Sequence, residues 1–180
     1  MQLDVSEVVG QPGAAMEVPL TVGLDPGDLG ADVLGVPGPL TGTAEVVGTE
    51  EGALVQFRLQ GEVELACGRC LQPYRFSVHL TFAEEFRTGP VAVGSAELEA
   101  ADDGSTFVVV ADGLIPVAEV VRQHLLLALP MKPLCRPDCA GLCPGCGVNL
   151  NEEPCRCEPE AGDPRLAVLR KLLDNPEAGG

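Results

Sequence analysis

Apolar and polar residues alternate along two stretches of the chain that flank a pair of cysteines. An alternation of period two places every second side chain on one face of a β-strand. The pattern predicts a long β-hairpin over 53–66 and 73–86, with Cys67 and Cys70 at its tip. Gly61 interrupts the first apolar face and suggests a bend or bulge. The predicted inward-facing residues are Val55, Phe57, Leu59, Val63 and Leu65, then Tyr74, Phe76, Val78, Leu80 and Phe82.

The rest of the first half predicts shorter strands separated by loops. Alternating apolar residues predict a strand over 16–22, and Pro19 suits an edge position because proline cannot donate to a sheet. Further short strands are expected over 44–47 and 106–111. Loops are predicted for a Gly-, Pro- and Asp-rich stretch and for an acidic stretch, over 25–39 and 97–105.

The second half of the chain changes to a helical period. Apolar residues at i, i+3, i+4 and i+7 predict an α-helix over 116–129. Pro116 suits its first turn and Pro130 ends it. Leu126 and Leu127 widen the apolar stripe, so we expect this helix to be well buried.

These elements predict an α+β fold, with a mostly antiparallel β-sheet or partly closed barrel covered by one helix. Residues 133–160 have turn residues and cysteines but no periodicity, so a zinc-ribbon-like, metal-binding segment is expected. A short helix over 164–173 is expected to follow. The predicted organisation is a β-rich core domain, a Cys-rich segment and a C-terminal helix with tail, over 1–132, 133–160 and 161–180.

The charge of the chain restricts its partners. Its 180 residues include 11 Lys and Arg against 27 Asp and Glu, which gives a formal net charge of −16. Phosphates repel such a surface, and the 3% of aromatic residues offers little for base stacking. The excess favours a basic partner, or solubility alone.

The sequence favours a cytoplasmic, reducing location. It begins without a basic, apolar leader, and its apolar runs are far shorter than the ~18 residues of a membrane-spanning helix. We therefore expect neither secretion nor membrane insertion.

Eight cysteines carry the candidate chemistry. Disulfides are rare in a reducing compartment, where clustered thiols bind soft metals, most often zinc through four ligands. The spacing suggests two sites of four thiolates, although it leaves the partition open and allows one or two structural Zn²⁺ ions. The grouping that closes a short local loop joins Cys143, Cys146, Cys155 and Cys157, which leaves Cys67, Cys70, Cys135 and Cys139.

Catalytic alternatives find little support in the sequence. The C-x3-C-x2-C spacing that begins at Cys139 occurs in radical SAM enzymes, but those enzymes use a large α/β barrel. A redox C-x-x-C requires a helix N-terminus rather than a turn between strands. His79 lies on a polar strand face, and His124 lies on the apolar helix face as a packed histidine does. We expect no enzyme and no small-molecule substrate.

Four motifs occur in order and cover roughly residues 53–173. They are Cys67-Gly68-Arg69-Cys70-Leu71, then Leu127-Ala128-Leu129-Pro130-Met131, the run from Cys135 to Asn151, and Asp163-Pro164-Arg165-Leu166. In this combination the chain resembles the bacterial YceD family of large ribosomal RNA subunit accumulation proteins. The resemblance implies a non-enzymatic role in making the large ribosomal subunit, judged by the accumulation of 23S rRNA.

The charge and the implied role together favour a basic large-subunit ribosomal protein or a pre-ribosomal particle as partner, with rRNA contacted indirectly. Two alternatives stay open. A nucleic-acid-binding zinc module needs Arg69, Arg75, Arg136 and Arg156 to converge on one face. A metal carrier or thiol sensor needs exposed, exchangeable sulfurs. The simpler interpretation is that Arg69 and Arg156 offset the negative charge of zinc tetrathiolate centres.

Overall fold

The two alternating stretches form the longest strands of the molecule, β5 (Gly52–Ala66) and β6 (Pro73–Thr88). The computed structural model describes residues 1–91, 96–100 and 106–157. The two strands pair antiparallel in one unbroken register, which confirms the predicted hairpin. The bulge predicted at Gly61 is wrong, because Gly61 pairs in register with Val78.

Seven strands form the main sheet, in the order β2–β4–β5–β6–β8–β7, with β3 pairing with β5 as well. Neighbouring strands are antiparallel except β6 and β8, which are parallel. The prediction of a mostly antiparallel sheet is confirmed, as is the edge position of the strand that contains Pro19. A separate ribbon pairs β1 with β9. The remaining strands are β1 (Leu3–Asp4), β2 (Ala15–Val22), β3 (Val33–Gly35), β4 (Leu40–Gly48), β7 (Ala96–Ala100), β8 (Thr106–Val110) and β9 (Leu114–Ile115).

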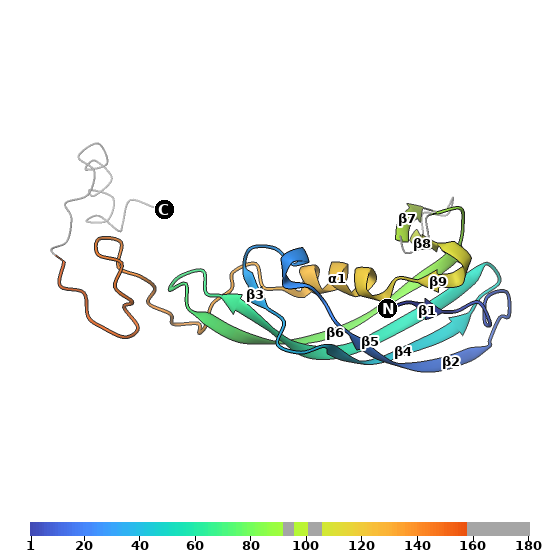
Figure 1. Cartoon of the computed structure of the whole chain (residues 1–180), viewed down its shortest axis with the longest axis horizontal. Helices are drawn as coiled ribbons and strands as arrows, with labels where there is room; N and C mark the ends of the chain where they lie inside the picture. The colour runs from blue at the N-terminus through green and yellow to red at the C-terminus, as the bar shows by residue number, and fades with distance from the viewer. Residues whose placement is uncertain (92–95, 101–105, 158–180) are drawn as a thin grey trace, which may run out of the picture.

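The single α-helix of the described residues, α1 (Val117–Ala128), lies along the concave side of the curled sheet (Figure 1). Two short 3-10 turns, η1 (Pro26–Asp28) and η2 (Ala111–Gly113), complete the elements. Phe57 and Val63 of the sheet are fully buried in one core with Val121 and Leu125 of the helix. The sheet and helix therefore form a half-barrel whose interior is filled by side chains.

His124 is packed, as its place on the apolar helix face predicts. Its ring stacks on Phe82, with 3.6 Å between ring centroids, and its Nε2 lies 2.7 Å from a carboxylate oxygen of Glu84. These contacts join α1 to β6. His79 is exposed on the opposite face of the sheet, as predicted.

Three expectations about these elements are wrong. Leu126 and Leu127 are 38% and 82% exposed. The face of α1 that contains Val121 and Leu125 packs on the sheet, whereas Leu126 and Leu127 lie on the side that faces water. The loop predicted over 97–105 contains part of β7, which is ordered by pairing with β8. The loop predicted over 25–39 contains β3, which pairs with β5 and buries Val33.

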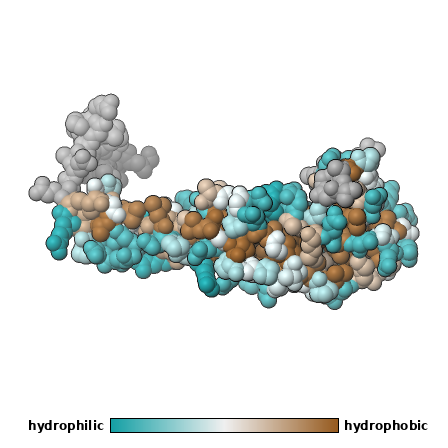
Figure 2. All heavy atoms as spheres, viewed as in Figure 1, coloured by the Kyte–Doolittle hydropathy of each residue, from teal (hydrophilic) through white to brown (hydrophobic). Residues whose placement is uncertain are grey.

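The Cys-rich segment continues from the end of α1 and lies beyond the tip of the β5–β6 hairpin, at one end of the molecule (Figure 1). In the view of Figure 2, hydrophobic residues are visible at this end and along the middle of the molecule. The division into 1–132, 133–160 and 161–180 stays a prediction, and the helix predicted over 164–173 lies outside the described residues. No helix in the described part of the chain is long and apolar enough to cross a membrane.

Candidate metal centres

The tip of the β5–β6 hairpin is a tight turn built around two cysteines. The Leu71 N–H donates to the Cys67 carbonyl at 2.9 Å, and the Cys67 N–H donates to the Gln72 carbonyl at 3.0 Å. Leu71 has a left-handed φ of 60°, which costs about 1–2 kcal/mol for a residue with a Cβ. The turn brings the sulfurs of Cys67 and Cys70 within reach of one ion.

The same turn recurs at the second C-x-x-C. The Gly147 N–H donates to the Cys143 carbonyl at 2.9 Å, and the Cys143 N–H donates to the Val148 carbonyl at 2.8 Å. Gly147 follows the second cysteine as Leu71 does, and its φ is 75°. The two turns therefore share one geometry. Glycine adopts it without steric cost, so the second turn has the favoured residue and the first does not.

The first cluster joins the hairpin tip to the segment that leaves α1. The Sγ atoms of Cys67 and Cys139 are 3.8 Å apart, and those of Cys70 and Cys135 are 3.7 Å apart. All four sulfurs lie within 4.8 Å of one another. Four thiolates that each lie about 2.3 Å from a zinc ion are about 3.8 Å from one another. The donor set and its spacing therefore fit tetrahedral zinc.

The second cluster closes a short loop within the Cys-rich segment. The Sγ atom of Cys155 lies 3.1 Å from that of Cys143 and 3.8 Å from that of Cys146. With Cys157, these sulfurs also lie within 4.8 Å of one another. The grouping of the eight cysteines is the one that short loop closure suggested, whereas metal binding at both clusters stays a prediction.

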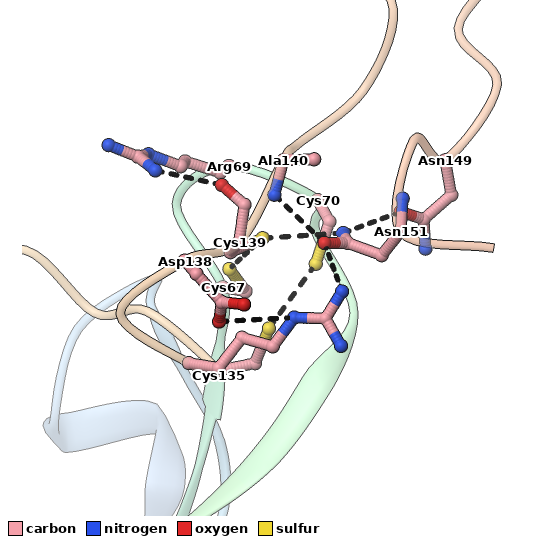
Figure 3. A network of polar contacts seen from close by, with 10 residues as sticks. Cys67, Arg69, Cys70, Cys135, Asp138, Cys139, Ala140, Asn149 and Asn151 are labelled. Atoms are coloured by element: carbon pink, nitrogen blue, oxygen red, sulfur yellow. Dashed lines mark hydrogen bonds and ion pairs between the residues drawn. The ribbon is translucent and has the colours of Figure 1, made fainter. Parts of the chain in front are cut away.

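A polar network surrounds Cys139 (Figure 3). The Asn151 side-chain amide donates to the Cys139 sulfur at 3.4 Å, and its oxygen accepts from the Ala140 N–H at 2.8 Å and from Arg136 at 2.6 Å. Arg69 donates to the Cys139 carbonyl at 2.8 Å. Contacts of this kind orient metal ligands and change metal affinity. The network therefore connects the loop of the second cluster to a ligand of the first.

Mutual repulsion prevents all the thiols from ionising together without a cation. Burial opposes ionisation of Cys67, but backbone N–H groups outweigh it and lower the pKa of this thiol to about 6. Backbone N–H groups and the Cys155 thiol lower the pKa of Cys143 to about 6 as well. Burial and neighbouring thiols raise the pKa of Cys135 to about 12, and neighbouring thiols raise that of Cys157 to about 12. A divalent cation removes this conflict, because it binds the thiolate form.

The arginines singled out by the sequence have different surroundings. Arg69 and Arg136 hold the loops around the first cluster, and Arg75 lies 3.3 Å from a Glu62 carboxylate oxygen. Arg156 has no hydrogen bond or ion pair with any residue that the structure describes. Arg69 contacts a carbonyl oxygen, and Arg136 contacts the Asn151 amide oxygen and, at 3.6 Å, an Asp138 carboxylate oxygen. These residues therefore position the loops rather than face the sulfurs directly.

Sequence reasoning assigned no role to Asn151. The residue ends the motif that runs from Cys135 to Asn151, but an asparagine between cysteines is typical of a turn. Only the folded chain brings its amide to the Cys139 sulfur, 12 residues away.

Comparison with known proteins identifies the family. A family model described as "Large ribosomal RNA subunit accumulation protein YceD" matches residues 55–173, a range that contains both cysteine clusters. The chain belongs to the YceD family. The family membership implies a role in large ribosomal RNA subunit accumulation.

Relatives of this YceD-family chain occur in bacteria and in a plant. An uncharacterized protein of Mycobacterium tuberculosis is 34% identical over 175 residues, which cover 96% of this chain and 81% of the relative. An uncharacterized protein of Mycobacterium leprae is 28% identical, over 84% of this chain and 68% of the relative. A maize protein named as a chloroplastic YCED homolog for large ribosomal RNA subunit accumulation is 28% identical, over 58% of this chain and 45% of the relative. No solved structure matches the chain.

Proposed function

We propose that this YceD-family chain is a non-enzymatic factor in large ribosomal subunit biogenesis that supports the accumulation of 23S rRNA. In this proposal zinc bound at the two cysteine clusters orders its Cys-rich end, and its sheet and helix bind a basic ribosomal protein on a pre-ribosomal particle. The family match to 55–173 is the observation on which the ribosomal role depends.

The placement of polar residues supports a binding role over catalysis. Within the described ranges, no polar or charged side chain is buried. Catalytic acids and bases usually depend on a shielded environment that shifts their pKa values. A half-barrel filled by α1, with its charges on the outside, is suited to presenting surfaces to a partner.

The distribution of charge supports a basic partner for the body of the molecule. The sheet and helix have four arginines, and each lies within ion-pair distance of a glutamate: Arg58 with Glu45, Arg75 with Glu62, Arg87 with Glu85 and Arg122 with Glu119. The other acidic residues of the sheet and helix are left in excess. Opposite charge steers association and suppresses wrong partners. A basic, lysine- and arginine-rich ribosomal protein fits this surface.

The rRNA content of cells and the sedimentation of the protein test the role. Depletion is expected to lower the ratio of 23S to 16S rRNA, and the wild-type chain is expected to restore it. The protein is expected to sediment with precursors of the large subunit and to crosslink there to a basic ribosomal protein. An unchanged rRNA ratio, with the protein remaining at the top of the gradient, contradicts the proposal.

A nucleic-acid-binding zinc module is the second candidate, and the position of the cations favours it. Five of the eight Lys and Arg residues in the described ranges lie at the Cys-rich end: Arg69, Arg75, Lys132, Arg136 and Arg156. Tight, salt-sensitive binding of the purified chain to bare 23S rRNA fragments, reduced by Arg156→Ala, supports this candidate. Binding that needs a ribosomal protein supports the first.

A further inference from the structure

The two cysteine clusters differ in exposure. Three cysteines of the first cluster, Cys67, Cys70 and Cys139, are buried, and Cys135 is exposed. In the second cluster only Cys143 is buried, whereas Cys155 is half-buried and Cys146 and Cys157 are exposed. A thiolate must be accessible to react with a solute or to pass its metal to a chelator. The second cluster therefore offers more of its sulfurs to solvent molecules than the first, of which only Cys135 is exposed.

The two clusters also differ in their supporting contacts. Tyr74, Leu134 and Leu142 pack against the first cluster, and the Asn151 amide donates to its Cys139 sulfur. Among the described residues, no side chain from outside the second cluster donates to its sulfurs. Supporting contacts of this kind change metal affinity by about 10- to 100-fold.

The sequence separation of the ligands differs in the same direction. Cys67 and Cys139 join segments 72 residues apart, whereas Cys143 and Cys155 are 12 residues apart. The first site thus joins the hairpin tip to the chain that follows α1, beside backbone bonds from the Gly68 N–H to the Pro133 carbonyl and from the Leu142 N–H to the Arg69 carbonyl. Release of the second site opens a local loop and leaves the sheet intact.

We propose that the second cluster is an exchangeable, oxidation-sensitive zinc site, whereas the first cluster is a permanent structural one. The oxidant is a peroxide of the hydrogen peroxide type. The proposal depends on zinc binding at both clusters and does not depend on the ribosomal role.

The oxidation follows from the sulfur positions. The exposed Cys146 thiolate attacks one peroxide oxygen, the O–O bond breaks, and a sulfenic acid forms as hydroxide leaves. The Cys155 thiolate, 3.8 Å from the Cys146 sulfur, then attacks the sulfenic sulfur, so that the S–S bond forms, the S–O bond breaks and a second hydroxide leaves. The two sulfurs together lose two electrons, which the peroxide gains. Two of the four ligands are then lost, and zinc leaves for the solvent.

The loop around Asn151 keeps the first cluster supported during this change. The Leu150 N–H donates to the Gly141 carbonyl at 2.9 Å, and Arg136 and the Ala140 N–H both donate to the Asn151 side-chain oxygen. None of these bonds involves a sulfur of the second cluster. Loss of the second zinc is therefore expected to leave the first in place.

Zinc release from the purified full-length chain tests the proposal. Elemental analysis of the zinc-loaded protein first counts the ions, with two expected. A chromogenic chelator in excess is then expected to remove one zinc at least about 10-fold faster than the other. Peroxide is expected to release one zinc with the loss of two thiols, and mass spectrometry is expected to find a disulfide between Cys146 and Cys155. The chain has one tyrosine and no tryptophan, so Tyr74 fluorescence reports on the first cluster and is expected to stay constant.

Matched variants assign the two phases. Cys157→Ser is expected to abolish the fast phase and to preserve the slow one, with the sheet still folded by circular dichroism. Cys135→Ser is expected to abolish the slow phase.

Three results overturn the proposal. They are a single release phase for both ions, peroxide disulfides that include cysteines of the first cluster, and a chain that binds only one zinc. All three are measured on purified protein, so they are distinguishable from failure of the ribosomal role, which the cellular rRNA ratio reports.

Discussion

Asn151 offers the sharpest test of how the loop of one cluster supports the other. Its amide donates to the Cys139 sulfur at 3.4 Å, while its oxygen accepts from Arg136 at 2.6 Å and from the Ala140 N–H at 2.8 Å. Its amide also donates to the Asn149 side-chain oxygen at 2.7 Å. Asn151→Ala removes all four bonds. Neutral hydrogen bonds contribute about 1 kcal/mol each and charged ones about 1.5–3 kcal/mol. Because Asn151 is half-buried, water replaces part of this loss.

The expected effect on zinc affinity is smaller than the sum of these bonds, because only one of them reaches a ligand. Loss of a supporting contact to a metal ligand costs about 10-fold in affinity, which is about 1.4 kcal/mol. Asn151→Ala is therefore expected to weaken zinc binding at the first cluster about 10-fold. Competition with a chelator, followed through Tyr74 fluorescence, measures this affinity.

Two further variants separate the sulfur contact from a general effect on the loop. Glu153→Gln, at an exposed residue of the same turn whose side chain makes no hydrogen bond to a described residue, is expected to leave zinc affinity unchanged. Asn151→Asp still accepts from Arg136 and Ala140, but it places a carboxylate oxygen against the Cys139 thiolate. It is therefore expected to bind zinc more weakly than Asn151→Ala does. Recovery of wild-type affinity in Asn151→Asp would refute the reasoning, because it would assign the whole effect to the loop.

Other predictions concern the sheet, the hairpin tip and the helix. Phe57→Ala empties a fully buried site beside two aromatic rings and is expected to lower the free energy of unfolding by about 3–5 kcal/mol in urea titrations; Leu54→Ala on the outer face of the same strand is the control. Leu71→Gly removes left-handed strain from an exposed residue and is expected to raise the melting temperature, with a gain of up to about 1 kcal/mol. Hydrogen bonds and the charge of Arg122 lower the pKa of Glu119 to about 2, so this pair stabilises the fold above pH 4.5 and its contribution is lost as the pH falls towards 2. Glu119→Gln is expected to cost about 0.5 kcal/mol at neutral pH, since the pair is partly exposed.

Each of these expectations has a clear contrary result. Equal losses for Phe57→Ala and Leu54→Ala would contradict the inward placement of Phe57. A lower melting temperature for Leu71→Gly would mean that the leucine side chain contributes more than its conformation costs. For Glu119→Gln, a stability difference that stays constant between pH 7 and pH 3 would exclude the ion pair as its source.

The hairpin and the helix show how much of the fold the local sequence predicts. Alternation over 53–66 and 73–86 is sufficient for the hairpin, because period-two patterning with an intervening turn is a local property. The helix over 116–129 is likewise encoded by its own spacing and its flanking prolines. The exposure of Leu127 was not predictable, because it depends on how much of the helix the curled sheet covers.

The sequence by itself determined the long hairpin, the helix and the presence of two C-x-x-C turns, since each depends on residues close together in the chain. The sequence also suggested the grouping of the cysteines but left it open. Only the tertiary structure decided that Cys67 and Cys70 meet Cys135 and Cys139, that β8 lies parallel to β6, and that Asn151 reaches Cys139. Those outcomes depend on contacts between segments far apart in sequence, whose geometry follows from the curl of the sheet and the path of the chain beyond α1. Periodicity carries no information about such distances, because it reports which side of an element is buried and not what lies against it.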